Sequence, residues 1–381
     1  MSDFVPTKHA VHVLPQGGLE GKLEKGRPLR VKLGIDPTSP DVHLGFAVVL
    51  DRLREWQDAG HTVVLIVGDY TARIGDPSGR SAERPVLADE ELDANAKRFR
   101  EQVVRVLDPE RTEFRFNGEW LAPLTFAETV RLTRTLTVAR RLERDDFAKR
   151  FAAGEPISLS ELLYPPMQAY DSVAIEADVE IGGTDQLYNL LAGRDVMPHY
   201  GLEPQVVVTY PLLVGLDGAE KMSKSRGNYI GINEPPEEMF GKTMSIPDEA
   251  LPQWWDLVVG AGEHPDDPLG WKLELARRIT ARWHGEDGAR AGEEHFTRVV
   301  RRHEAPEEVE EARLEGQDPL HLPAFLAATL GESTSHWRRT IDQGGVKLDG
   351  RPVAGYDHAW SELDGRTLQA GKRRFLRLVS S

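Results

Sequence analysis

The stretch between residues 29 and 67 constrains the fold more than any other part of the chain. Leu29–Ile35 is a run of aliphatic and β-branched residues that ends in a turn signal, Asp36-Pro37-Thr38, as strands do. Apolar residues recur at helical spacing from Leu44 to Ala59, and Thr62–Val67 is an apolar run typical of a strand buried on both faces. A strand, a helix and a buried strand in fewer than 40 residues predict a βαβ unit, and therefore an α/β fold with a parallel sheet.

A further buried strand is expected at Gln205–Thr209. In open parallel sheets, ligands bind at the carboxyl ends of the strands. The polar motifs described below fall at such ends, so we expect the functional site at that edge of the sheet.

Composition excludes several classes of protein. The chain has 381 residues, of which 40% are hydrophobic and 29% charged, which excludes a disordered chain or a coiled coil and predicts two or three domains. It has no cysteine, which excludes disulfides, thiolate zinc sites and cysteine nucleophiles. The first ten residues do not resemble a secretory signal, and no apolar run approaches the roughly 20 residues that span a bilayer. We therefore expect a cytoplasmic protein without a membrane segment.

The charge is distributed unevenly. The net charge of −15 argues against nucleic-acid binding by the whole surface. From Asp318 onward, however, nine Lys and Arg residues outnumber seven Asp and Glu residues, which leaves −17 on the rest of the chain. A local basic patch is able to bind RNA whatever the total charge.

Changes in residue pattern and composition divide the chain into four parts. Strand patterns end near residue 228, and helical patterns follow from 229 to 303. An acidic segment at 304–318 is expected to be a linker, with an exposed helix as the alternative. A small module is expected at 319–381, with a helix around Trp337 and a glycine-flanked hairpin at Gly344–Gly350.

The first chemical motif follows the first predicted strand. After the turn at Asp36, a helix is expected to begin with His43 and Gly45 in its first turn. Free backbone N–H groups and the helix dipole favour a phosphate there, and a glycine lets a nucleotide lie against the backbone. The alternative is an ordinary strand-to-helix loop with an incidental histidine.

The second motif is Lys221-Met222-Ser223-Lys224-Ser225, which lies between glycines. Two ammonium groups on a glycine-flanked loop suit a pyrophosphate leaving group, whose charge grows in the transition state. A lysine-rich loop alone is usually just solvated, but together with the histidine motif it indicates two halves of one nucleotide clamp.

A third motif places three polar side chains on one helical face. Tyr164, Gln168 and Asp171 have the spacing i, i+4 and i+7, and Pro165 and Pro166 predict that the helix begins there. Such a stripe is suited to lining a pocket for a small polar ligand. The alternative is a helix start with solvated polar residues.

These motifs resemble those of the class I aminoacyl-tRNA synthetases, whose signatures read His-Ile-Gly-His and Lys-Met-Ser-Lys-Ser. The resemblance is strongest to the bacterial tyrosyl branch and covers nearly the whole chain. It is carried by five segments: residues 36–46, Ile74–Gly79, Tyr164–Asp171, Gly182–Gln186 and Lys221–Ser225.

The resemblance implies a fold and an activity. It implies a Rossmann-like catalytic domain at 1–228 with a dimer-interface insertion, a helical anticodon-binding domain at 229–303, and a small ribosomal-protein-like RNA-binding domain at 319–381. The implied reaction joins L-tyrosine to tRNA-Tyr through a tyrosyl-adenylate, in a homodimer. ATP with Mg²⁺ is the implied co-substrate, with no tightly bound cofactor and no dedicated protein metal site.

The resemblance also assigns roles residue by residue. Catalytic roles in charge stabilisation fall to Thr38, His43, Lys221 and Lys224. Tyrosine binding falls to Asp76, Tyr164, Gln168, Asp171 and Gln186. ATP binding falls to Asp36, His43, Gly45, Gly183, Asp185, Lys221, Met222, Ser223, Lys224 and Ser225. A mobile loop is assigned Arg80 and Arg84, and RNA binding is assigned Arg338, Arg339, Lys347, Lys372, Arg373 and Arg374.

Three positions depart from the commonest family pattern. Phe46 stands where the second signature histidine usually lies, and Arg80 replaces a lysine. Lys32 stands where one branch has a tyrosine beside the substrate phenol, so that second hydroxyl contact is in question. Two alternatives therefore stay open: a synthetase-like paralogue that activates another amino acid, and a non-enzymatic RNA-binding protein.

Overall fold

The structure is a computed structural model. It describes residues 7–38, 41–76, 88–260, 262–301, 309–371 and 374–380. Four residues with predicted roles lie outside these ranges: Arg80, Arg84, Lys372 and Arg373. The chain forms two compact units, of which the first comprises Met1–Glu234 and Ser245–Trp271, and the second Pro235–Met244 and Lys272–Ser381.

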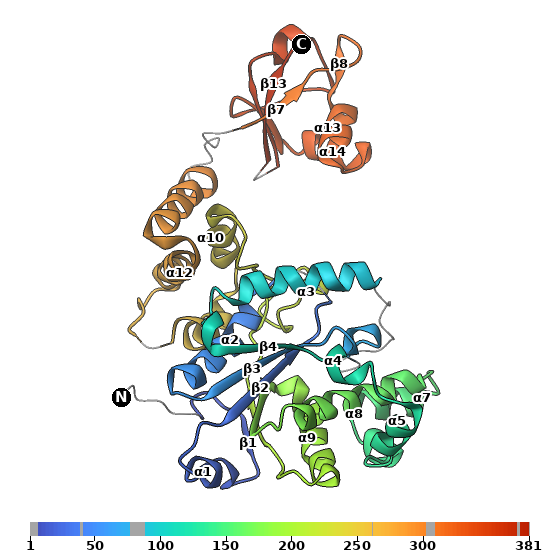
Figure 1. Cartoon of the computed structure of the whole chain (residues 1–381). Coiled ribbons are helices and arrows are strands. Elements are labelled where there is room, and N and C mark those ends of the chain that lie inside the picture. The colour runs from blue at the N-terminus through green and yellow to red at the C-terminus, as the bar shows by residue number, and fades with distance from the viewer. Residues whose placement is uncertain are drawn as a thin grey trace. The chain divides into compact units, whose positions relative to one another are not determined.

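A six-stranded sheet forms the centre of the first unit (Figure 1). Its strands are β1 (His12–Leu14), β2 (Arg30–Ile35), β3 (Thr62–Val67), β4 (Thr112–Phe116), β5 (Val179–Gly183) and β6 (Val206–Tyr210). Their spatial order is β1-β6-β5-β2-β3-β4, and every neighbouring pair is parallel except β1 and β6. The chain therefore leaves β2 in one direction and returns to its other side at β5, which is the topological switch point where such sheets bind ligands.

Ten helices belong to the described part of the first unit, and some of them pack directly on this sheet. They are α1 (Gly18–Leu23), α2 (Leu44–Asp58), α3 (Asp89–Val103), α4 (Gly118–Leu121), α5 (Phe126–Thr133), α6 (Val138–Arg141), α7 (Asp145–Ala153), α8 (Leu159–Ala174), α9 (Leu187–Val196) and α11 (Leu251–Trp254). Helix α2 contacts β2, β3 and β5, whereas α9 contacts α8, β5 and β6. Strands β3, β5 and β6 are buried almost throughout, as continuous apolar runs predict. The expected α/β fold, its βαβ unit and the strand near residue 205 are confirmed.

The predicted start of the pocket-lining helix is wrong. Helix α8 begins at Leu159, so that Pro165 and Pro166 lie inside it. The start is fixed by a capping box, in which the side chains of Ser158 and Glu161 each accept a hydrogen bond from the other residue's backbone N–H. This Ser-x-x-Glu signal is visible in the sequence but was not used in the prediction. The proline rings leave the helix short of backbone donors, but packing against α9 holds it together.

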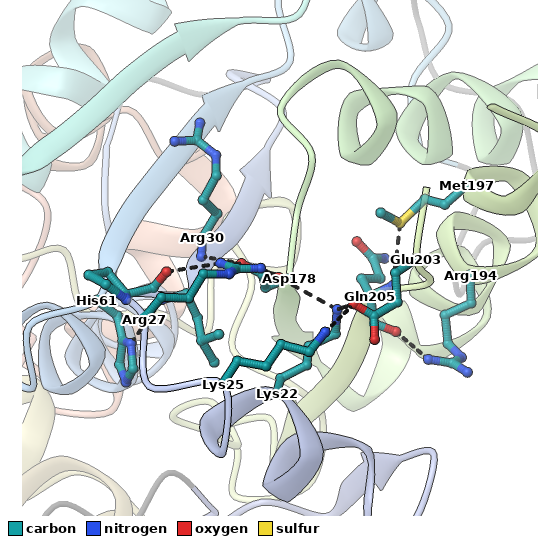
Figure 2. A network of polar contacts seen from close by, with 12 residues as sticks. Lys22, Lys25, Arg27, Arg30, His61, Asp178, Arg194, Met197, Glu203 and Gln205 are labelled. Atoms are coloured by element: carbon teal, nitrogen blue, oxygen red, sulfur yellow. Dashed lines mark hydrogen bonds and ion pairs between the residues drawn. The ribbon is translucent and has the colours of Figure 1, made fainter. Parts of the chain in front are cut away.

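A network of ion pairs lies at the amino ends of β2 and β5 (Figure 2). The Asp178 carboxylate accepts two hydrogen bonds of 2.7 Å from the Arg27 guanidinium and one of 3.0 Å from the Arg30 backbone. The Lys22 ammonium lies 3.5 Å from Asp178 and 3.3 Å from Glu203. The network therefore holds β5 beside β2, and every carboxylate in it faces a cation.

The second unit contains two helical segments and a small α/β module. Its helix α10 (Pro236–Met244) and the part of α12 (Pro268–Phe296) that begins at Lys272 share a cluster in which Phe240 and Ala276 are fully buried. Helix α12 is interrupted at Gly285, whose φ of 73° is left-handed and therefore easily adopted by glycine.

The module has its own sheet and its own core. The strands are β7 (Glu310–Arg313), β8 (Leu320–His321), β9 (Val346–Leu348), β10 (Arg351–Pro352), β11 (Asp357–His358), β12 (Thr367–Ala370) and β13 (Arg374–Val379). The helices are α13 (Leu322–Leu330), α14 (Thr334–Asp342) and α15 (Trp360–Leu363). The main sheet has the order β10-β9-β12-β13-β7, and its core includes Trp337, Val346 and Leu376. The hairpin expected at Gly344–Gly350 is present but lies slightly further along the chain, because β9 and β10 pair across a turn at Asp349 and Gly350.

The expected linker at 304–318 is partly wrong. Residues 310–313 form β7, which pairs in parallel with β13, and Ala312 and Leu314 are buried in the module's core. Three of its four residues, Glu310, Glu311 and Arg313, are charged and exposed, and only Ala312 is buried, so the strand carries no apolar alternation in its sequence. The other predicted boundaries, and the roles assigned to these parts, stay predictions.

No helix within the described ranges is both long and apolar enough to span a membrane.

Candidate functional site

A cavity of about 880 Å³ opens at the switch point of the sheet. It is lined by the carboxyl ends of β2 and β5, the first turn of α2, one face of α8 and the loop that follows β6. Every residue assigned to tyrosine or ATP lines this cavity: Asp36, Thr38, His43, Gly45, Asp76, Tyr164, Gln168, Asp171, Gly183, Asp185, Gln186, Lys221, Met222, Ser223, Lys224 and Ser225. The fold therefore brings five separate sequence motifs to one place, while the role of each residue stays a prediction.

The polar stripe of α8 forms one wall of the cavity. Tyr164 donates its hydroxyl to Asp36 Oδ2 at 2.9 Å, which joins α8 to the end of β2. Thr71 donates to the other oxygen of Asp36 at 2.7 Å. This close approach requires Gly68, because a Cβ there would lie 2.2 Å from Asp36 and 2.3 Å from Thr71.

Asp171 is the most deeply buried acid of the cavity, at 2% exposure. Its two carboxylate oxygens accept hydrogen bonds from neutral donors, Trp120 Nε1 at 2.8 Å and Asn117 Nδ2 at 3.3 Å. Burial raises the pKa of Asp171 to about 7, although the charge of Lys32 and these two hydrogen bonds act in the opposite direction. A carboxylate with free acceptor capacity in an apolar place is suited to accept a hydrogen bond from a ligand hydroxyl.

Neither donor to Asp171 was predicted from the sequence. Asn117 directly follows β4, whose carboxyl end belongs to the same edge of the sheet as the motifs that were recognised. A strand assignment at residues 112–116 would have found it. Trp120 lies in the short helix α4, which follows Asn117 directly, and carries no sequence signal of its own.

A second polar cluster surrounds Asp76. Its carboxylate accepts hydrogen bonds from Gln186 Nε2 at 2.7 Å and Asn189 Nδ2 at 3.2 Å. Asn189 also donates to Gln186 Oε1 at 3.1 Å and is fully buried. Asn189 was missed, although its spacing of three residues from Gln186 places both on one helical face. The cluster offers an anionic oxygen to a cationic ligand group.

The opposite side of the cavity holds the histidine motif. His43 is the N-cap residue of α2, and its ring stacks on Phe46 with centroids 4.4 Å apart. Burial, together with the charges of Lys224 and Lys221, lowers the pKa of His43 to about 3, so the imidazole is neutral at physiological pH. Phe46 thus supports the His43 ring by stacking instead of offering a second polar group. Gly45 leaves this helix start open, since a Cβ there would lie 3.1 Å from the His43 ring.

The lysine motif faces the cavity from a turn closed by glycine. Lys221 Nζ donates to Asp185 Oδ2 at 2.6 Å, and Lys224 contacts the backbone carbonyl of Asp41 and its carboxylate, the latter at 3.6 Å. Burial lowers the pKa of Lys224 to about 8, so it carries a positive charge at pH 7. Gly227, with a φ of 67°, ends the turn. Two cations therefore border the part of the cavity that lies next to the start of α2.

Lys32 makes no contact with the cavity. Its side chain is fully buried, and its ammonium lies 2.9 Å from Glu180 Oε1. It also donates to the Gln168 carbonyl at 2.9 Å and to Ser172 Oγ at 2.8 Å. At this position, one branch of the family has a tyrosine beside the phenol of the substrate. In this chain, Lys32 instead forms a buried ion pair beneath α8.

The predicted RNA-binding residues within the described ranges lie on three elements of the C-terminal module. Arg338 and Arg339 are exposed on α14, Lys347 lies on β9, and Arg374 is exposed on β13. Arg338 also lies over the Tyr356 ring at 5.6 Å. Their binding role stays a prediction.

No group of three or more potential metal ligands occurs among the residues that the structure describes. The absence of a protein metal site stays a prediction.

The chain is similar to known proteins over nearly its whole length. Residues 24–309 match the family described as tRNA synthetases class I (W and Y). A tyrosine–tRNA ligase of Moorella thermoacetica is 49% identical, over 96% of this chain and 92% of the relative. A tyrosine–tRNA ligase of Thermotoga maritima is 48% identical, over 97% of this chain and 95% of the relative.

Solved structures share the fold. A C-terminally truncated mitochondrial tyrosyl-tRNA synthetase of Aspergillus nidulans matches with a TM-score of 0.62 and 21% identity, covering 76% of this chain and 91% of that one. A tyrosyl-tRNA synthetase of Archaeoglobus fulgidus in complex with L-tyrosine matches with a TM-score of 0.57 and 22% identity, covering 75% of this chain and 97% of that one.

Proposed function

Because the chain belongs to the tRNA synthetases of class I (W and Y), we propose that it is a tyrosine–tRNA ligase that works in the cytoplasm. In the first step, the carboxylate of L-tyrosine attacks the α-phosphorus of ATP, forming a new P–O bond and expelling pyrophosphate. In the second step, a hydroxyl of the terminal ribose of tRNA-Tyr takes the tyrosyl group and releases AMP.

One observation carries the choice of tyrosine over phenylalanine. Asp171 is a buried carboxylate whose described partners, Trp120 and Asn117, are neutral donors. A phenol hydroxyl is able to donate a further hydrogen bond to this carboxylate, whereas a phenylalanine ring offers no donor and only covers the buried charge with apolar surface, which is unfavourable. The choice of tyrosine over tryptophan, whose indole N–H also donates a hydrogen bond, is supported by the two relatives above, both tyrosine–tRNA ligases at nearly half identity.

The other cavity residues suit the two remaining parts of the substrate complex. The α-ammonium group of tyrosine is matched by oxygens of Asp76, Gln168 and Tyr164. The adenosine and phosphates of ATP, which bind as the complex with Mg²⁺, are matched by the start of α2 and by Asp185. No tightly bound cofactor is needed for this chemistry.

Catalysis in the first step needs charge stabilisation more than proton transfer. The attacking carboxylate is already ionised at neutral pH, and the neutral imidazole of His43 is suited to donate a hydrogen bond to a phosphate oxygen. The ammonium groups of Lys221 and Lys224 are suited to stabilise the departing pyrophosphate.

A second copy of the chain is the proposed partner of the segment between α5 and α8. Large apolar side chains are exposed there: Phe126 at 84%, Val130 at 43%, Val138 at 59%, Phe151 at 66% and Leu159 at 79%. A cluster of exposed apolar residues in one segment is typical of a protein interface. Light scattering of the purified protein should give twice the chain mass, and Phe126→Asp should shift it toward one chain.

The C-terminal module is the proposed second RNA contact, alongside an anticodon-binding role for α10 and α12. The double variant Arg338→Ala/Arg339→Ala should raise KM for tRNA while leaving tyrosine activation unchanged, because both arginines are exposed and lie outside the cavity. Unchanged KM for tRNA would assign the contact to other residues.

Amino-acid-dependent exchange of pyrophosphate into ATP tests the activity directly. Only L-tyrosine, in a panel that includes phenylalanine and tryptophan, should support rapid exchange. Exchange with another amino acid would indicate a paralogue of different specificity. No exchange with any amino acid would mean that the nucleotide site is inactive.

A further inference from the structure

A buried ion pair joins the two central strands directly below the cavity. Lys32 on β2 and Glu180 on β5 are register partners of the parallel pair, and their side chains are 0% and 1% exposed. A buried pair of this kind is weak evidence of stability by itself. The free energy lost when both charges are desolvated is about as large as the free energy gained from their attraction. Its presence below the cavity therefore calls for another explanation.

The ammonium of Lys32 fixes the helix above it. Its three acceptors are Glu180 Oε1 at 2.9 Å, the Gln168 carbonyl at 2.9 Å and Ser172 Oγ at 2.8 Å. An ammonium group has three donors, so all of them are used. The backbone of α8 at Gln168 is thus held at a defined height above the sheet.

Glu180 fixes the orientation of the Gln168 side chain. Its carboxylate accepts hydrogen bonds from Gln168 Nε2 at 3.3 Å and Ser172 Oγ at 3.3 Å, and a further one from Gln205 Nε2. A carboxylate only accepts hydrogen bonds, so the edge of the Gln168 amide that faces it must be the NH₂ edge. The amide oxygen is then directed away from Glu180.

The amide oxygen of Gln168 is the atom available to accept a hydrogen bond from the substrate's ammonium group. Gln168 lines the cavity and is 8% exposed, and its Oε1 is buried without a hydrogen-bond partner among the described residues. The carboxylate of Asp76 and the hydroxyl of Tyr164 border the same cavity. An ammonium group bound there is able to donate to Gln168 Oε1, whereas the reversed amide would present two donors to a cation.

On the basis of the proposed function, we propose that Lys32 and Glu180 are positioning residues that hold the Gln168 amide with its oxygen toward the α-ammonium group of tyrosine. The pair therefore sets the selection for the amino group, at a distance from the phenol. This role differs from that of the tyrosine that one branch of the family carries in place of Lys32.

Two ligands separate this role from a merely structural one. L-Tyrosine and 3-(4-hydroxyphenyl)propionate share the phenol and the carboxylate, but the second lacks the amino group. Their dissociation constants are measured by titration calorimetry on the full-length protein. Glu180→Gln should weaken L-tyrosine binding about tenfold or more, because glutamine also donates and no longer holds the amide in one orientation. Binding of the propionate should change less than about twofold, since its contacts do not include Gln168 Oε1.

Two further variants keep the test decisive. The double variant Lys32→Met/Glu180→Gln removes both buried charges and replaces the single variant if Glu180→Gln does not fold. It should show the same loss of preference for L-tyrosine over the propionate. Lys22→Met is the matched control, because Lys22 is also buried and paired with carboxylates, yet lies in the network of Figure 2 outside the cavity lining. It should leave the ratio of the two dissociation constants unchanged.

The outcomes distinguish this inference from the function it rests on. If the variants weaken both ligands equally, or neither, the positioning role is wrong while the proposed function stands. If the wild-type protein does not bind L-tyrosine at all, the proposed function fails and this inference fails with it. A crystal structure of the wild-type protein with L-tyrosine gives a readout that needs no variant: an ammonium nitrogen more than about 3.5 Å from the Gln168 amide would overturn the positioning role.

Discussion

Buried carboxylates lie at both ends of the parallel sheet, but the groups that contact them differ in charge. At the amino end, Asp178 faces the guanidinium of Arg27 and the ammonium of Lys22. At the carboxyl end, Asp171 faces the neutral donors Trp120 and Asn117. The charge of Asp178 is balanced by cations of the protein, whereas Asp171 is still able to accept a hydrogen bond from a ligand.

The pKa directions express this difference. Burial raises the pKa of Asp178, but the hydrogen bonds from Arg27 and the Arg30 backbone outweigh it and leave the pKa below its ordinary value. Burial raises the pKa of Asp171 to about 7, and its partners do not reverse the rise. A perturbed carboxyl group without a cation in direct contact is therefore the better indicator of a functional site than burial or charge alone.

The largest effect is expected when Lys224, which borders the cavity, is replaced, in comparison with Lys22 at the amino end of the sheet. Lys224→Ala should lower the rate of pyrophosphate exchange at pH 7 by roughly 10²-fold or more, the scale of losing one preorganised donor to a developing charge. The dissociation constant for tyrosine, measured by calorimetry without ATP, should stay nearly unchanged. Lys22→Met should reduce thermal stability but leave the exchange rate of the folded protein unaltered. An equal loss of tyrosine binding in Lys224→Ala would contradict the assigned role.

The next effect compares the two aspartates directly. Asp171→Asn should lower kcat/KM for tyrosine in the exchange reaction roughly 10- to 100-fold, because it removes a hydrogen bond to a charged acceptor. The value for phenylalanine should change little, so the discrimination between the two amino acids narrows. Asp178→Asn should leave this ratio as in the wild type. A ratio that moves equally in both variants would mean that the two ends of the sheet do not differ in function.

The smallest effect is a pH dependence. With a pKa of about 7, Asp171 is mostly ionised at pH 8 and mostly protonated at pH 6. Because the carboxylate is the stronger acceptor for a phenol hydroxyl, tyrosine affinity should fall as the pH falls, by about tenfold from pH 8 to pH 6. Asp178, whose pKa is lowered, stays ionised across this range and contributes nothing. Calorimetric titrations of the wild type and Asp171→Asn check this: the variant should show a flat profile, and a wild-type profile just as flat would refute the assignment.

Much of the site was predictable because its motifs are local. Lys221–Ser225 and the turn after Asp36 identify their chemistry within a few residues, and the strand patterns place both at the same edge of the sheet. The start of α8 was predicted wrongly because the helix was placed from the prolines at 165 and 166 alone, without the capping box at Ser158. β7 was missed because its acidic residues resemble a solvated segment.

The sequence by itself determined the alternation of strands and helices, the nucleotide motifs and the polar stripe of α8, because each depends on periodicity or spacing within a short stretch. The tertiary structure alone decided that Trp120 and Asn117 meet Asp171, and that Lys32 pairs with Glu180 instead of reaching the cavity. These contacts join segments that are distant along the chain. They depend on which strands become neighbours, and a pattern read along a single strand does not contain that information.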